Sequence, residues 1–284
     1  MHLDFSRPGL PGLLLATDLS PRCDRPLERA KQLAAEFGAA LEVLTVYESP
    51  QEPGAVGDWL DGSRGLEREA HAARVEIAQE FQSSGMQVNQ RFLAGRVDDT
   101  ILAAAAALPD YLVVTGSSRK ETLGHHILGS TVERLARGLT QPLLVVRRRV
   151  RGSYANILVA IDGSPTSRLA LRMAAAIFPG RRIVAFHAHV PNDLLESGAA
   201  QHDAMERFLD DCGLPPAVRA HIETVIAEGD PEPLLTGFAR TNAVDLAVLG
   251  LHTEPALLRL LAGSRREHLL QDFSCDTMLV PAAP

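Results

Sequence analysis

Two stretches of this sequence carry the same turn residues at the same spacing, and this repeat constrains the fold more than any other feature. An Asp-x-Ser-Pro motif at 18–21 recurs at 162–165, 144 residues later. The glycines that follow recur with a displacement of 134 residues: Gly95, Gly116 and Gly129 match Gly229, Gly250 and Gly263. The difference between the two displacements fits a shorter loop after the second predicted strand of the second half. Glycines that stay in step over this distance indicate two copies of one domain, fused head to tail.

Each copy alternates short apolar runs with amphipathic segments. We predict strands at 13–17, 41–47, 88–94, 111–115 and 143–146, and again at 157–161, 183–190, 222–227, 246–249 and 277–280. We predict helices at 20–38, 63–85, 98–107 and 130–138, then from 164 onward, at 203–212 and at 231–240. Apolar strands between helices are typical of a parallel sheet covered on both faces. We therefore expect two tandem, doubly wound α/β domains, at 1–148 and 154–284, each with a five-stranded, mainly parallel sheet and joined by an arginine-rich linker.

Composition and charge exclude several classes of protein. The formal net charge of −7 argues against a nucleic-acid partner, because binding to phosphate backbones needs clustered Lys and Arg. Cys23, Cys212 and Cys275 are far apart and form no CxxC pair, so neither a disulfide framework nor a zinc site is predicted. The first residues lack the apolar segment of a secretory signal, and the longest apolar run, 101–108, is far shorter than the roughly 20 residues of a membrane span. We expect a cytoplasmic protein without a membrane partner.

The predicted topology places chemistry at one edge of each sheet. Open parallel sheets bind ligands beyond the carboxyl ends of their strands, at the point where the strand order reverses. If the first and fourth strands are neighbours, Asp18 and Gly116 meet at that point. The residues at 129–131, Gly-Ser-Thr, then open the last helix with free backbone N–H groups. A carboxylate for ribose hydroxyls beside a helix N-terminus for phosphates suits a nucleotide.

These motifs resemble the universal stress protein family, and the resemblance covers nearly all of both halves. Nucleotide-binding members of the family carry Gly-x2-Gly-x9-Gly-Ser/Thr after the fourth strand. The first half reads Gly-Ser-Ser-Arg at 116–119 and Gly-Ser-Thr at 129–131. The second half reads Gly-Leu-His-Thr at 250–253 and Gly-Ser-Arg at 263–265. Both copies depart from the signature at its second glycine, where the first half has Arg119 and the second has Thr253.

The resemblance implies a Rossmann-like fold and two sets of site residues. It places Asp18 and Asp162 at the acidic position after the first strand, and the backbone of Val46 and Ala188 beside adenine. In the first half we expect an ATP, ADP or AMP site, with any metal limited to Mg²⁺ carried by the nucleotide, made by Asp18, Val46, Gly116, Arg119, Gly129, Ser130 and Thr131. In the second half we expect a degenerate copy made by Asp162, Ala188, Gly250, Gly263, Ser264 and Arg265. Arg119 supplies a positive charge for phosphate in place of glycine's conformational freedom, whereas Thr253 supplies neither.

Simpler interpretations of the same residues stay open. Asp18 and Asp162 can organise the turn into the first helix of each half, and Ser164 is predicted to be a helix N-cap rather than a nucleophile. Arg265 can dock an anion or pair with nearby acids. His187 and His189 point to one face of a strand, but no third ligand lies at a supporting spacing, so no metal site is predicted.

Two functions fit this sequence. The first is a stress-response protein that binds an adenine nucleotide in its first half and presents a conformation that partners recognise. The second is a nucleotide-independent scaffold for protein or other anionic partners. The sequence lacks a dinucleotide fingerprint, a P-loop and a hydrolase elbow, so we expect at most slow ATP hydrolysis. The resemblance also implies that the last strands, 143–146 and 278–280, pair across a pseudo-twofold axis; further dimerisation and the identity of partners stay open.

Overall fold

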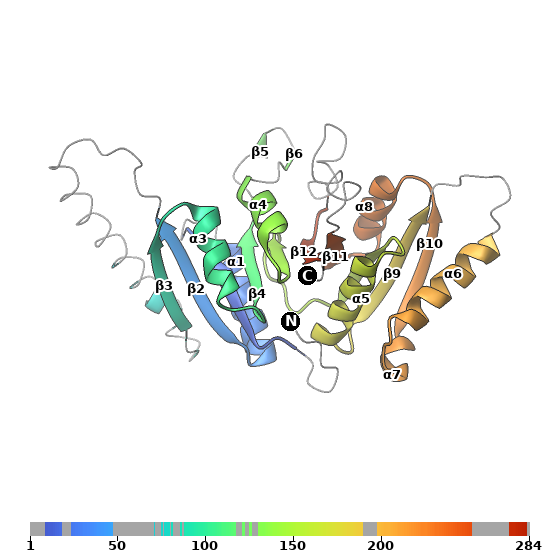
Figure 1. Cartoon of the computed structure of the whole chain (residues 1–284), viewed down its shortest axis with the longest axis horizontal. Coiled ribbons are helices and arrows are strands. Elements are labelled where there is room, and N and C mark those ends of the chain that lie inside the picture. The colour runs from blue at the N-terminus through green and yellow to red at the C-terminus, as the bar shows by residue number, and fades with distance from the viewer. Residues whose placement is uncertain are drawn as a thin grey trace.

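A computed structural model of the chain describes residues 9–18, 24–47, 88–117, 130–189, 198–251 and 273–282, and also 71, 75, 77–79, 81, 86, 121–122 and 125–126. The two sequence repeats form two halves side by side, with β3 and β10 at the outer sides and β12 near the middle (Figure 1). Within these residues, no helix combines the length and apolar character needed to cross a membrane.

Where the structure describes it, the first half follows the predicted order of strands and helices; the helix predicted at 63–85 lies mostly outside the described residues. Its elements are β1 (Gly12–Ala16), α1 (Asp24–Phe37), β2 (Ala40–Tyr47), β3 (Val88–Ala94), α3 (Val97–Ala106), β4 (Leu112–Gly116), α4 (Ser130–Gly138) and β7 (Leu143–Val146). Between β4 and α4, where we expected only a loop, β5 (Glu121–Thr122) and β6 (His125–His126) form a two-residue antiparallel ladder. A strand of two residues is too short to show an alternation of apolar and polar residues, so it could not be predicted from the sequence.

The second half repeats this order with small differences. Its elements are β8 (Asn156–Ile161), α5 (Pro165–Ile177), β9 (Arg182–His189), α6 (Gly198–Asp211), α7 (Pro216–Arg219), β10 (Ile222–Glu228), α8 (Pro231–Thr241), β11 (Leu246–Leu251) and β12 (Asp276–Pro281). The prediction for α6 was wrong at its start, because its first turn, Gly-Ala-Ala-Gln, has no apolar periodicity. The short helix α7 was missed, and β11 continues one residue past Gly250, where we expected it to end.

Within the described residues, the strands other than β5 and β6 join into one sheet. The strand order is β10-β9-β8-β11-β12-β7-β4-β1-β2-β3, so each half has five strands in the same relative order. Every neighbouring pair is parallel except the central pair, β12 and β7, which is antiparallel with Met278 opposite Leu144. The predicted fold class and the pairing of the last strands are therefore confirmed. This pairing also covers two sheet edges that would otherwise lie open.

Two apolar layers cover the faces of the sheet. Along β1, Leu13 and Leu15 pack in the cluster that contains residues of α1, α5 and α6, whereas Leu14 packs in the cluster that contains residues of α3, α4 and α8. Alternate residues of a strand point to opposite faces, so a strand buried on both faces must be apolar throughout. This explains why the strands were recognisable as short uninterrupted apolar runs.

Candidate functional site

The innermost strands of the first half end together at the point where the strand order reverses. Leu13 lies opposite Leu112, and Leu15 lies opposite Val114, in the parallel pair of β1 and β4. The chain adds β2 and β3 on one side of β1 and then crosses to place β4 on the other. Continued by the same register, Asp18 and Gly116 come to one edge of the sheet, as the sequence predicted. We call this place, at the carboxyl ends of β1 and β4, the first switch point.

The pairing of β1 with β4 ends at Leu15 and Val114, whereas β1 stays paired with β2 to Ala16 and β4 stays paired with β7 to Gly116. The N–H of Thr17 donates to the carbonyl oxygen of Leu44 on β2 at 3.0 Å, whereas the N–H of Ser117 donates to that of Val146 on β7 at 3.2 Å. Each strand is therefore tied to its outer neighbour. This divergence leaves Asp18, which is exposed, directly beyond the end of the β1–β4 pairing.

The other predicted residues of the first half are distributed around this edge. Val46 lies near the end of β2, half-buried and opposite Leu93 of β3. Ser130 is the first residue of α4, and Thr131 is half-buried in its first turn. Arg119 and Gly129 lie outside the described residues.

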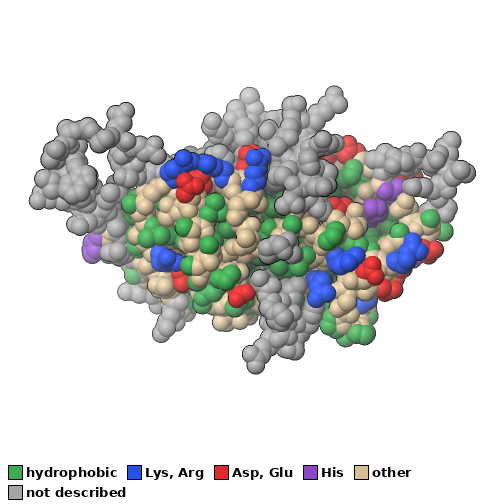
Figure 2. Space-filling model, viewed as in Figure 1, with side chains coloured by type: hydrophobic (Ala, Val, Ile, Leu, Met, Phe, Trp, Pro, Cys, Tyr) green, Lys and Arg blue, Asp and Glu red, His purple; other side chains and the backbone are tan. Residues whose placement is uncertain are grey.

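A cluster of charged residues lies at the same edge, beyond β3. Arg96 follows Gly95, whose N–H donates to the carbonyl oxygen of Tyr47 at 2.9 Å. The guanidinium of Arg96 lies 3.8 Å from Asp98 and 3.2 Å from Asp99, and Arg134 of α4 also pairs with Asp98. Basic and acidic side chains gather over the upper ends of α3 and α4 in Figure 2. Neither Arg96 nor Arg134 was predicted from the sequence, although Arg96 directly follows one of the repeated glycines.

The second half has the same backbone arrangement at β8 and β11, the second switch point, but different side-chain chemistry. Asp162 accepts a hydrogen bond from the N–H of Ser164 at 3.1 Å, so this carboxylate organises the turn into α5. Ser164 in turn caps α5 by accepting from the N–H of Ser167 at 3.0 Å, as predicted. In the position that corresponds to Arg96, Asp230 caps α8 by accepting from the N–H of Glu232 at 3.2 Å.

Gly250 has a packing role that needs no ligand. A Cβ atom at this position would lie 2.8 Å from the backbone carbon of Thr166 and 2.9 Å from the nitrogen of Ser167. The first turn of α5 therefore packs directly on β11 at a distance that excludes a side chain. Ala188 lies near the end of β9 and is half-buried. Gly263, Ser264 and Arg265 lie outside the described residues.

His187 and His189 of β9 lie together, as the strand alternation predicted. Their ring centroids are 6.1 Å apart with an interplanar angle of 15°. The Nδ1 atom of His187 lies 2.8 Å from the carbonyl oxygen of Ile161, a hydrogen bond that fixes this ring against the end of β8. In the part of the chain that the structure describes, no group of three or more His, Cys, Asp or Glu side chains is arranged to hold a metal ion.

Comparison with known proteins identifies the family. The family model described as "Universal stress protein family" matches twice, over residues 12–147 and 153–281. The chain belongs to the universal stress protein family. Each half, with its five-stranded sheet, is thus one universal stress protein domain, and the central β7–β12 pair joins the two domains.

Relatives within the universal stress protein family match both the whole chain and its halves. A universal stress protein of Synechocystis is 23% identical over 297 residues, which cover 94% of this chain and 98% of the relative. Universal stress protein A homolog 1 of Coxiella burnetii is 30% identical over 142 residues, which cover 47% of this chain and 94% of the relative. The crystal structure of a universal stress protein from Archaeoglobus fulgidus superposes with a TM-score of 0.73 at 18% identity, covering 95% of this chain and 98% of that one. The tandem architecture is thus found in other members.

Proposed function

We propose that the first domain binds one adenine nucleotide at the first switch point, and that nucleotide binding sets a conformation that partner proteins recognise. The observation that carries this proposal is the divergence of β1 and β4 directly before Asp18. Each strand donates its last hydrogen bond to its outer neighbour, through the N–H groups of Thr17 and Ser117. A ligand placed there meets backbone polar groups of both strand ends and an exposed carboxylate, which is the usual location of nucleotides in open α/β sheets.

The roles of the residues follow from their chemistry. The carboxylate of Asp18 accepts hydrogen bonds from ribose hydroxyls, and the backbone of Val46 meets the edge of adenine. The N-terminus of α4, at Ser130 and Thr131, offers N–H groups and the positive end of a helix dipole to phosphates. Gly116 and Gly129 belong to the same proposed site, and Arg119 adds a positive charge for the phosphates. Any hydrolysis is slow, because Asp18 is the only candidate base among the residues of the proposed site.

The second domain is proposed to be a poor nucleotide site. The edge beyond β10 carries Asp230 where the first domain has Arg96, and Thr253 stands where the first domain has Arg119. A carboxylate in place of an arginine at this edge disfavours a polyphosphate by like-charge repulsion. We therefore expect one nucleotide per chain.

The test is the nucleotide content of the purified protein, measured by denaturing it and separating the released small molecules. We expect close to one equivalent of ATP, ADP or AMP, lost in Asp18→Ala and retained in the matched variant Asp162→Ala. Added ATP at about 100 times its dissociation constant should stabilise the apoprotein by about 2.7 kcal/mol. A protein that is purified empty and shows no thermal shift in millimolar ATP would favour the nucleotide-independent scaffold instead, which the loss of the second signature glycine at Arg119 and Thr253 would then explain.

A further inference from the structure

A buried carboxylate lies at one end of the contact between the two domains. Asp276, the first residue of β12, is fully buried. It accepts hydrogen bonds from the N–H groups of Arg147 at 2.7 Å and Arg148 at 2.9 Å, and from the hydroxyl of Tyr154 at 2.7 Å. Its Oδ2 atom also lies 3.4 Å from the Nε of Arg29, whose side chain is only 5% exposed. A carboxylate removed from water is tolerated only with such a complete set of partners.

The cation of this cluster comes from the other domain. Arg29 is on α1, and its guanidinium lies 4.0 Å from the centre of the Tyr154 ring. It also donates to the carbonyl oxygen of Gly152 at 2.8 Å and to Gln32 at 2.7 Å. The first domain thus supplies the buried positive charge, and the second domain supplies the buried negative charge and the tyrosine.

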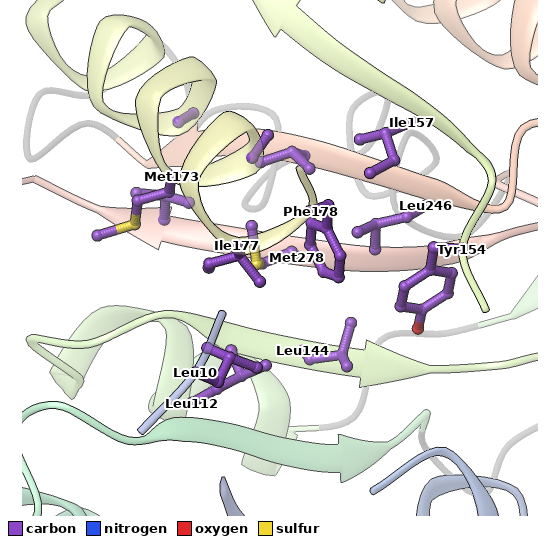
Figure 3. Packing of buried hydrophobic residues seen from close by; sticks show 14 of the residues in the cluster. Leu10, Leu112, Leu144, Tyr154, Ile157, Met173, Ile177, Phe178, Leu246 and Met278 are labelled. Atoms are coloured by element: carbon purple, nitrogen blue, oxygen red, sulfur yellow. The ribbon is translucent and has the colours of Figure 1, made fainter. Parts of the chain in front are cut away.

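The pseudo-twofold axis generates a second, corresponding end of the contact, and that end is apolar. The register of the repeat and of the strand pairs matches each member of the cluster with a counterpart that has no charge: Arg29 with Met173, Asp276 with Pro142, Tyr154 with Leu10, and Arg147 with Pro281. Pro281 has no N–H group, so the backbone donor is lost there too. Figure 3 shows Leu10 and Tyr154 on opposite sides of Leu144, with Met173 and Ile177 toward the apolar end.

We propose that this cluster makes the pairing face of each domain specific for the other domain, so that neither domain pairs with a copy of itself. If two first domains paired through β7, each Arg29 would be buried against a copy of Leu10 and Pro142, with no carboxylate. If two second domains paired through β12, each Asp276 would meet a copy of Met173 and Pro281, with no cation. Both arrangements bury an unpaired charge, and only the unlike pairing balances it.

The partner of each face is therefore the unlike domain, either of the same chain or of a second copy. The apolar centre of the contact does not make this distinction. Leu144 and Met278 are equivalent by the repeat and lie opposite each other at its centre, so apolar packing there accepts like and unlike pairs equally. Discrimination must come from charged contacts between the domains. Glu36 of the first domain and Arg181 of the second form one such pair at 2.6 Å, but it is partly exposed, whereas Arg29 and Asp276 are buried and so depend most on each other.

The equivalence of Leu144 and Met278 provides a direct test in the full chain. In a like pair of first domains residue 144 faces its own copy, and in a like pair of second domains residue 278 does. Facing residues of an antiparallel pair have Cα atoms about 4.5–5.5 Å apart, within the range that a disulfide spans. Leu144→Cys and Met278→Cys therefore report the two like pairings separately, as covalent dimers on a non-reducing gel after refolding from urea at high protein concentration and oxidation.

Removal of one charge should permit one like pairing and not the other. Arg29→Met should increase the covalent dimer through Cys at 144 but not at 278, and Asp276→Asn should do the reverse, each by at least about tenfold, the factor that corresponds to 1.4 kcal/mol. The double variant Arg29→Met/Asp276→Asn, in which no charge is left unpaired, should increase both. The same chains without the added cysteine, which keep the native cysteines, give the background amount of covalent dimer.

Two results would overturn the proposal. One is equal crosslinking at both reporter positions in each single-charge variant, which would indicate general loosening of the contact. The other is the absence of crosslinks at both positions in the folded double variant, which would mean that apolar packing alone excludes like pairs. Circular dichroism of each variant shows whether it has refolded.

Discussion

The first domain places Leu13 opposite Leu112 in its two innermost strands, and the second domain places Ile157 opposite Leu246 in the same register. The two domains thus agree in the residues that set topology. They differ in the positions of their charged residues. Asp230 stands in place of Arg96 beyond the third strand, and Met173 stands in place of Arg29 on the first helix. The apolar pattern that specifies the fold is therefore the same in both domains, while the charged residues differ at the edge beyond the third strand and at the pairing face.

The comparison also separates two uses of the same glycine position. Gly250 is closely packed, because the backbone of α5 occupies the space of any side chain. At Gly116 a Cβ atom would lie 3.5 Å from Cγ of Pro26, an ordinary van der Waals contact within the described residues. Glycine at the end of the fourth strand is therefore a weak indication of a nucleotide when it stands alone.

The largest expected effect comes from making the first domain resemble the second at the pairing face. Arg29→Met leaves the buried carboxylate of Asp276 without its cation, and we expect a loss of about 3–5 kcal/mol in the free energy of unfolding. At the equivalent position, Met173→Leu should cost less than about 1.5 kcal/mol, because it only changes shape in an apolar environment. Urea unfolding followed by circular dichroism measures both. Similar losses in the two variants would show that the pairing face is not electrostatically asymmetric.

A second effect should depend on pH. Burial, and then the charge of Asp276, raise the pKa of Tyr154 well above its ordinary value. The folded protein keeps this proton when the unfolded chain has lost it, so stability is complete below pH about 10 and falls as the pH rises further. For an unfolded pKa near 10, the loss at pH 11 from this group alone is about 1.4 kcal/mol.

Tyr154→Phe isolates this contribution. The variant loses a hydrogen bond to Asp276 at every pH, but its stability should fall less steeply than that of the parent between pH 9 and pH about 11. Burial also raises the pKa of the thiols of Cys212, to about 11, and Cys275, to about 12. Because both thiols titrate in both proteins, the difference between the two pH profiles reports Tyr154. Parallel profiles would mean that the hydroxyl is not held protonated by the fold.

The smallest expected difference is at the edge beyond the third strand of each domain. Asp230 caps α8 through its side chain, whereas Arg96 begins α3 without a side-chain cap. Asp230→Ala should therefore lower the free energy of unfolding by about 1 kcal/mol. Arg96→Ala should lower it by less than about 0.5 kcal/mol, because the guanidinium of Arg96 is exposed and Arg134 still pairs with Asp98. Thermal unfolding of the two variants decides this order. A larger loss for Arg96→Ala would mean that Arg96 and its acidic partners beyond β3 stabilise the fold, rather than being available for a ligand.

Local sequence was sufficient to predict most strands, but not all of the helices. Leu143–Val146 was predicted with its observed bounds, since a strand covered on both faces is an apolar run between polar turns. Val88–Ala94 was also predicted with its observed bounds, although it is a partly exposed edge strand that contains Asn, Gln and Arg. The start of α6 at Gly198 and the one-turn helix at Pro216 were missed because neither has the apolar repeat that marks a buried helix face.

The pairing of the last strands was implied by the family resemblance, and the order of the strands within each domain is seen only in the tertiary structure. The sequence by itself determined the two-domain repeat and the alternation of strands and helices within each domain. These features depend on the periodicity of apolar residues and glycines, which is local and is present in the chain before it folds. Only the tertiary structure showed that Arg29 and Asp276, from opposite ends of the chain, form one buried pair. No local pattern marks such a pair, because its value comes from burial, and burial exists only once the two domains pack against each other.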